Sequence, residues 1–159
     1  MTKRAVIACA MLTAGLVAGA CGKPVDLKQS LQVTDVTSGW FDAGIVEGKN
    51  KLVPTVTFTL RKAEGVANSA VALNLVFKTS DTGDESNDEF VQRVEFNGNE
   101  TAPIVVRSKS GYTADPPQSR ADMLKHSQFR DMDVEIFAKQ TSQWVSLHKT
   151  RIERQLLTR

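Results

Sequence analysis

The chain is poor in the residues that build covalent cross-links. Its 159 residues include only two cysteines, Cys9 and Cys21, and both lie in the first 21 positions. No cysteine follows residue 21, so no disulfide can link segments of the rest of the chain. That part must therefore fold on an apolar core alone, which a single domain of this length can form.

Side chains for catalysis are equally scarce. The chain has two histidines and one tyrosine, and it has no Gly-x-Ser-x-Gly segment of the kind that carries a nucleophilic serine. His148 lies in an alternating segment and His126 in a long connection, which are ordinary surroundings for surface histidines. No pair of Cys or His has the spacing of a zinc site. We expect no enzyme activity and no cofactor.

A carboxylate-rich stretch at residues 81–89 is the one candidate for a metal site. Its five carboxylates would suit Ca²⁺, which prefers oxygen ligands, but Gly83 stands where an EF-hand loop needs an oxygen side chain. An acidic hairpin loop that discourages edge-to-edge association of sheets is the favoured interpretation. We expect no metal, and a calcium site is the alternative.

The longest apolar run is too short to span a membrane. It covers residues 5–18, whereas a helix needs about 20 residues to cross a hydrocarbon core of ~30 Å. Lys3 and Arg4 precede the run, and Ala18-Gly19-Ala20 follows it. This layout is typical of a secretory signal peptide. We expect residues 1–20 to be removed.

Cys21 follows these small residues directly. The segment resembles the lipobox of bacterial lipoproteins, with Ala18 where leucine is usual. The resemblance implies lipidation of Cys21 by diacylglycerol, usually with a further acyl chain such as palmitate, and so a permanent membrane anchor. Gly22, in place of Asp, favours the periplasmic face of the outer membrane if the cell is Gram-negative. A soluble exported form and an uncleaved anchor are the alternatives.

Charge excludes one class of partner. The chain has 20 Lys and Arg against 18 Asp and Glu, and Lys3 and Arg4 leave with the signal peptide. The remaining chain is therefore neutral, and it offers no net field to attract a polyanion. We expect no nucleic-acid partner.

Short alternating segments dominate the rest of the chain. Residues 21–28 have no apolar period and predict a lipidated N-terminus and tether, followed by one domain at 29–159. Strands are expected near 31–36, 45–46, 55–61, 71–78, 90–96, 104–107, 132–139 and 144–152. The pattern predicts an all-β fold, an immunoglobulin-like two-sheet antiparallel sandwich of seven to eight strands, with a closed barrel as the alternative. At most one short helix is expected within 108–131, where Ser119 and Asp122 form a capping pattern.

One family resemblance covers residues 50–107. The alternating segment Ser69–Phe77, the Asp81/Gly83 turn and the segment Gly98-Asn99-Glu100-Thr101-Ala102-Pro103-Ile104 follow one another. This order resembles the FxLYD and LEA14-like group of immunoglobulin-like domains. The resemblance implies a non-catalytic envelope module and carries over no site residues.

Trp40 and Phe41 are the candidates for contact with a partner. Gly39, Asp42 and Gly44 surround them, which predicts a turn. The two aromatic rings either cover one end of the core or form an exposed recognition tip. We expect Trp40 to be buried and Phe41 to be partly exposed.

Two functions fit these features of the sequence. The first is a lipid-anchored binding or accessory module of the cell envelope, whose partner is an envelope protein still to be identified. The alternative is a carrier or sensor of an apolar ligand held between the sheets, for which Ala63, Ala67, Ala70 and Ala72 would provide small inward side chains. The basic residues of the last strand and tail, interpreted as solvated, could instead contact phosphate headgroups: Lys149, Arg151, Arg154 and Arg159.

Overall fold

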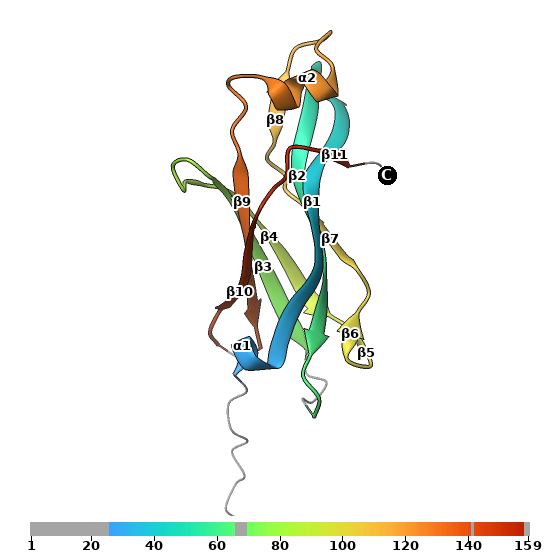
Figure 1. The fold of residues 1–159 in the computed structure, drawn as a ribbon, viewed down its shortest axis with the longest axis vertical. Helices are drawn as coiled ribbons and strands as arrows, with labels where there is room; N and C mark the ends of the chain where they lie inside the picture. The colour runs from blue at the N-terminus through green and yellow to red at the C-terminus, as the bar shows by residue number, and fades with distance from the viewer. Residues whose placement is uncertain (1–25, 66–69, 141, 158–159) are drawn as a thin grey trace, which may run out of the picture.

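The computed structural model describes residues 26–65, 70–140 and 142–157, and it is an all-β sandwich of two sheets (Figure 1). One sheet contains β1 (Leu31–Val46), β2 (Lys49–Lys62), β5 (Phe96–Asn97), β6 (Glu100–Thr101), β7 (Ile104–Arg107), β8 (Tyr112–Ala114) and β11 (Leu156–Leu157). The other has the order β10 (Val145–Arg151), β9 (Met132–Lys139), β3 (Val71–Thr79) and β4 (Glu85–Val94). The predicted sandwich is confirmed. The described residues form eleven strand segments because several are only two to four residues long.

The core lies between the two sheets and follows the period of two that the sequence predicted. Side chains on the inner face of β3 alternate with half-buried ones, and the same holds in β9. The fully enclosed inner side chains on β2, β3 and β9 are Leu52, Val56, Phe58, Leu60, Leu73, Leu75, Phe77, Val134, Ile136 and Ala138. Burial of these apolar faces is the main stabilising contribution to the fold.

The turn predicted at Trp40 and Phe41 is wrong. Both residues lie inside β1, opposite Pro54 and Val53 of β2. Bulges after Thr34 and after Asp42 let the strand continue through the segment that resembles a turn. The true hairpin turn is Glu47-Gly48, where φ is positive at both residues (51° and 78°), as a two-residue type I′ turn requires.

Pro54 lies within β2, although proline is usually confined to edge strands, strand starts and bulges. The backbone N–H of Trp40, which is opposite Pro54, donates to the carbonyl of Gln155 on the other side of β1. The Trp40–Pro54 pair therefore exchanges no backbone hydrogen bonds, and the missing N–H of Pro54 costs none between β1 and β2. On its other side, β2 pairs with β8 up to Leu52 and with β7 from Thr55 onward, so Pro54 lies between the two partners.

Simple alternation along the strand expected near 90–96 would place Phe90 and Val94 on one face, and this phase is wrong. Val71 pairs with Val94, but Leu73 pairs with Val91, so β4 carries one extra residue across that interval. The bulge brings Val91 and Val94 to the core and turns Phe90 outward, where it is 54% exposed.

Two short helices lie at opposite ends of the sandwich (Figure 1). The expected helix is α2 (Arg120–Lys125), and the Ser119 hydroxyl accepts a hydrogen bond from the Asp122 N–H as the predicted cap. The other, α1 (Leu27–Ser30), was not expected: Leu27 is buried in the core, so the folded domain begins inside the segment predicted as tether. Neither helix of the described chain is long and apolar enough to cross a membrane.

Candidate functional site

Trp40 lies in the core at the α2 end of the sandwich. It is 1% exposed, and its ring meets the ring of Phe129 edge to face at a centroid distance of 4.6 Å. Phe129 in turn meets Tyr112 at 5.1 Å. Three aromatic rings from β1, β8 and the segment before β9 thus close this end of the core. The predicted burial of Trp40 is confirmed.

Phe41 points to the opposite face of the same strand. It is half-buried on the outer face of the larger sheet, and the guanidinium of Arg107 lies over its ring at 3.8 Å. Its partial exposure is confirmed. Because the two side chains lie on opposite faces of β1, they do not form one recognition tip.

The residues with the most concentrated polar chemistry line an open groove near Trp40. The groove has a volume of about 630 Å³ and lies between the β3–β4 turn, the segment before β9 and the segment after β10. It is lined by Ser80, Asp81, Ser127, Gln128, Phe129, Arg130, Asp131, Arg151 and Arg154, and we call it the arginine groove. Its lining holds three guanidinium groups and two carboxylates.

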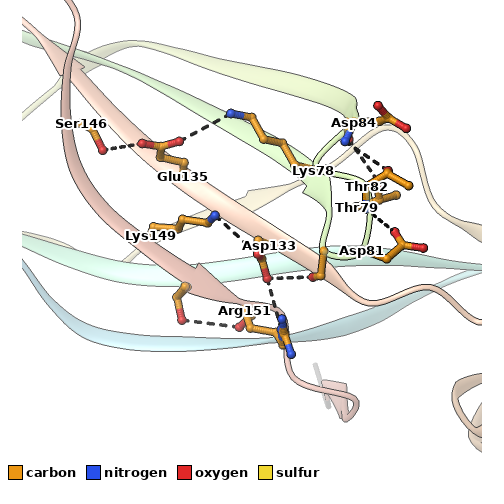
Figure 2. A network of polar contacts seen from close by, with 12 residues as sticks. Lys78, Thr79, Asp81, Thr82, Asp84, Asp133, Glu135, Ser146, Lys149 and Arg151 are labelled. Atoms are coloured by element: carbon orange, nitrogen blue, oxygen red, sulfur yellow. Dashed lines mark hydrogen bonds and ion pairs between the residues drawn. The ribbon is translucent and has the colours of Figure 1, made fainter.

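Asp133 fixes one side of this groove (Figure 2). Its carboxylate accepts a hydrogen bond from the Ser80 hydroxyl at 2.8 Å and one from Arg151 Nε at 3.2 Å, and Lys149 Nζ lies 3.6 Å away. Farther along β9, Glu135 accepts from Ser146 and pairs with Lys78. Strands β3, β9 and β10 are thereby joined by charges on the outer face of the smaller sheet.

These contacts change the acidity of Asp133. Partial burial alone would raise its pKa, but the hydrogen bonds from Ser80 and Arg151 and the charges of Arg151 and Lys149 outweigh that effect. The pKa of Asp133 therefore lies below its ordinary value, and the carboxylate stays ionised beside the groove.

Arg154 is held in place on the other side. Its Nε donates to Asp131 at 2.6 Å, its Nη1 donates to the Leu124 carbonyl, and its guanidinium lies 5.0 Å from the centre of the Phe129 ring. The hydrogen bond to Asp131 raises the pKa of Arg154, so it remains charged. Arg130 is exposed and has no hydrogen bond or ion pair with the described residues. An anionic group entering the groove would meet two oriented guanidiniums and one free guanidinium, which suits carboxylates and phosphates.

The remaining predicted residues lie elsewhere. Cys21 is outside the described residues. His126 caps α2, and its Nδ1 lies 3.2 Å from the Tyr112 hydroxyl. In the acidic stretch only Asp81 and Asp84 belong to the turn, because residues 85–89 continue as β4. Within the described ranges, no group of three or more His, Cys, Asp or Glu is placed to hold a metal ion.

Of the four alanines that the alternative function would place between the sheets, the three that the structure describes do not face that space. Ala63 and Ala70 are exposed, and Ala72 is half-buried beside inward-facing Val71 and Leu73. Ala67 lies outside the described residues. The inner faces carry large, fully enclosed side chains instead, among them Phe58 and Phe77.

Sequence reasoning identified Arg151 and Arg154 only as members of a basic tail and missed Arg130 and Ser80. The segment Arg130-Asp131-Met132-Asp133, where charged residues directly precede a strongly alternating strand, is a signal for Arg130 alone. Comparison of the chain with models of protein families, with curated proteins and with solved structures finds no match.

Proposed function

We propose that this chain is a lipid-anchored, non-catalytic binding module of the bacterial cell envelope, and that it holds a protein partner through the arginine groove. Cys21, placed after Ala18-Gly19-Ala20, supplies the anchor, at the periplasmic face of the outer membrane in a Gram-negative cell. The resemblance to FxLYD and LEA14-like immunoglobulin-like domains supports a module that binds rather than catalyses.

The main support for this proposal is that the arginine groove and the point where the chain enters the domain lie at opposite ends of its long axis. The described chain starts at α1, beside the first residue of β1. Asp42, near the other end of β1, pairs with Arg120 of α2. At about 3.3 Å per residue, the distance from Leu31 to Asp42 is roughly 35 Å. The end that carries α2 and the arginine groove is therefore held well away from an anchor at Cys21.

The groove suits a protein surface better than a small molecule. It is open to solvent, and its charges are already partly paired by Asp131 and Asp133. Such a surface selects a partner by complementary carboxylates at an interface and discriminates against cationic surfaces. The alternative function, a carrier of an apolar ligand between the sheets, has no support from the packing of the inner faces described above.

The anchor is tested by replacing Cys21 with Ser. This variant should carry no acyl chains, and it should either accumulate as uncleaved precursor that still contains residues 1–20 or appear as a domain in the soluble fraction. A Cys21→Ser protein that lacks residues 1–20 and still partitions with lipoproteins would contradict the anchor.

The binding surface is tested by Arg130→Glu, with Arg93→Glu as a matched control, since Arg93 is also exposed but lies on β4 outside the groove. After chemical cross-linking in cells, the wild type and the control should yield the same cross-linked envelope protein, and Arg130→Glu should lose it. Equal recovery with all three proteins would show that the groove is not the binding surface.

A further inference from the structure

An exposed aromatic pair lies on the outer face of the smaller sheet, away from the arginine groove. Phe90 on β4 is 54% exposed and Trp144, just before β10, is 39% exposed. Their rings meet edge to face at a centroid distance of 5.7 Å. Lys139 Nζ lies 5.4 Å from the centre of the Trp144 ring. We call Phe90, Trp144 and Lys139 the aromatic patch.

We propose that the aromatic patch rests on the lipid surface to which the chain is anchored. This inference rests on the proposed lipidation of Cys21. It assigns the patch a lipid partner that is distinct from the protein partner of the arginine groove.

The patch lies at the end of the domain where the chain enters. Strand β9 ends at Lys139 and β10 begins at Val145, so the connection that carries Trp144 is at the foot of the smaller sheet. Helix α1 packs against β10, and Figure 1 shows α1 and the start of β10 at the same end of the sandwich. The groove and α2 are at the other end.

The length of the tether keeps this end close to the bilayer. Five residue steps separate Cys21 from Asp26, which caps α1. A fully extended chain spans at most about 3.6 Å per residue, so the first residue of the described domain lies within about 18 Å of the lipidated cysteine. The end of the domain that carries α1 is therefore close enough to the bilayer to contact the headgroup region repeatedly.

The chemistry of the patch matches that region. Tryptophan is enriched at membrane interfaces because its ring is largely apolar and its N–H is polar. Lysine beside it can lay its aliphatic stem along apolar surface and keep its ammonium among phosphates. Lys28 of α1 adds an exposed cation at this end beside the half-buried Lys139, but the exposed Glu64 follows the adjoining end of β2. The contact therefore depends on the aromatic rings more than on net charge.

The test uses the acylated mature protein, reconstituted in phosphatidylethanolamine–phosphatidylglycerol vesicles that contain brominated phospholipid. Trp40 and Trp144 are the two tryptophans of the chain, and Trp40 is enclosed, so Trp144→Phe identifies the signal of Trp144 by difference. We expect the brominated lipid to quench the fluorescence of Trp144, and we expect the emission of Trp144 to shift to the blue. Phe90→Ala should weaken the quenching, and 1 M salt, where the screening length is about 3 Å, should largely preserve it.

Mass spectrometry of the reconstituted protein separates the two ways to fail. Unmodified Cys21 would contradict the proposed anchor. Acylated protein whose Trp144 is quenched no more than in detergent would overturn the lipid contact. If the emission of Trp144 shifts further to the blue as protein concentration rises in lipid-free detergent, the patch contacts a second copy of the chain. If the blue shift of Trp144 appears in native envelopes but not in vesicles, the patch contacts another protein. Each of these two results overturns the proposal.

Discussion

Replacing Trp40 with Ala should cost the domain about 3 kcal/mol of its free energy of unfolding. Truncation of a fully buried large aromatic typically costs ~3–5 kcal/mol, and this ring also loses its edge-to-face contact with Phe129. One feature places the expected value at the lower end of that range. The indole Nε1 of Trp40 is buried and has no hydrogen-bond partner in the part of the chain that the structure describes, and removing an unpaired buried donor recovers ~1–3 kcal/mol.

Two companion variants should have smaller effects on the free energy of unfolding. Trp40→Phe keeps an aromatic ring against Phe129 and removes the unpaired N–H, so its cost should stay near 1 kcal/mol or below. Phe41→Ala should also cost about 1 kcal/mol, since the ring is half-buried and its main contact is a cation–π interaction with Arg107.

Urea unfolding of the Cys21→Ser mature chain, followed by far-ultraviolet circular dichroism, measures all three variants without depending on tryptophan emission. The expected order of stability is wild type, then Trp40→Phe and Phe41→Ala together, then Trp40→Ala. A Trp40→Ala domain within 1 kcal/mol of the wild type would refute the placement of this ring in the core. A larger loss from Phe41→Ala than from Trp40→Ala would show that the two faces of β1 are exchanged.

Further predictions concern the core, the dependence of stability on pH in acid, and the absence of disulfides. Phe58→Ala and Leu75→Ala should each cost roughly 2–5 kcal/mol in the same urea assay, because both side chains are fully enclosed; losses below 0.5 kcal/mol at both sites would contradict the strand phase. Asp133 has a folded-state pKa below its ordinary 3.8, so its contribution to stability is present above that value and disappears as pH falls through the folded pKa. Asp133→Asn should therefore be less stable than the wild type at pH 7 and approach it as pH falls below 3.8 and through the lowered folded-state pKa of Asp133, and a constant difference across this range would contradict the ion pairs. Unfolding of the mature domain should be identical with and without reductant, and a shift in midpoint would contradict a monomer without cross-links.

Local alternation predicted the parts of the fold where each strand has one inner face and no bulge. Strands β3 and β9 follow it through Leu73, Leu75, Val134 and Ile136. It failed at Phe90 because a bulge in β4 changes the phase, and a bulge leaves no mark in the residue pattern.

The segment Gly39–Gly44 shows a different limit. Its glycines and Asp42 have local turn propensity, but pairing with β2 along most of β1 and with β11 at Trp40 and Phe41 decides its conformation. Those partners are far apart in sequence, so local propensity could not indicate them.

The arginine groove was beyond prediction for the same reason. Its residues come from three segments, near Ser80, Arg130 and Arg154, that meet only after β3, β9 and β10 have paired. The sequence supplied the charges and the partial identification of Arg151 and Arg154. It could not indicate that Asp131 and Asp133 would orient two of the guanidiniums.

The most direct test of the central proposal is the mass of the N-terminal peptide of the protein isolated from its native membrane. Lipid anchoring predicts a peptide that begins at Cys21 and carries a thioether-linked diacylglycerol, with or without an additional acyl chain on its amine. A peptide that begins at Cys21 with a free thiol, or one that still contains residues 1–20, would contradict the account.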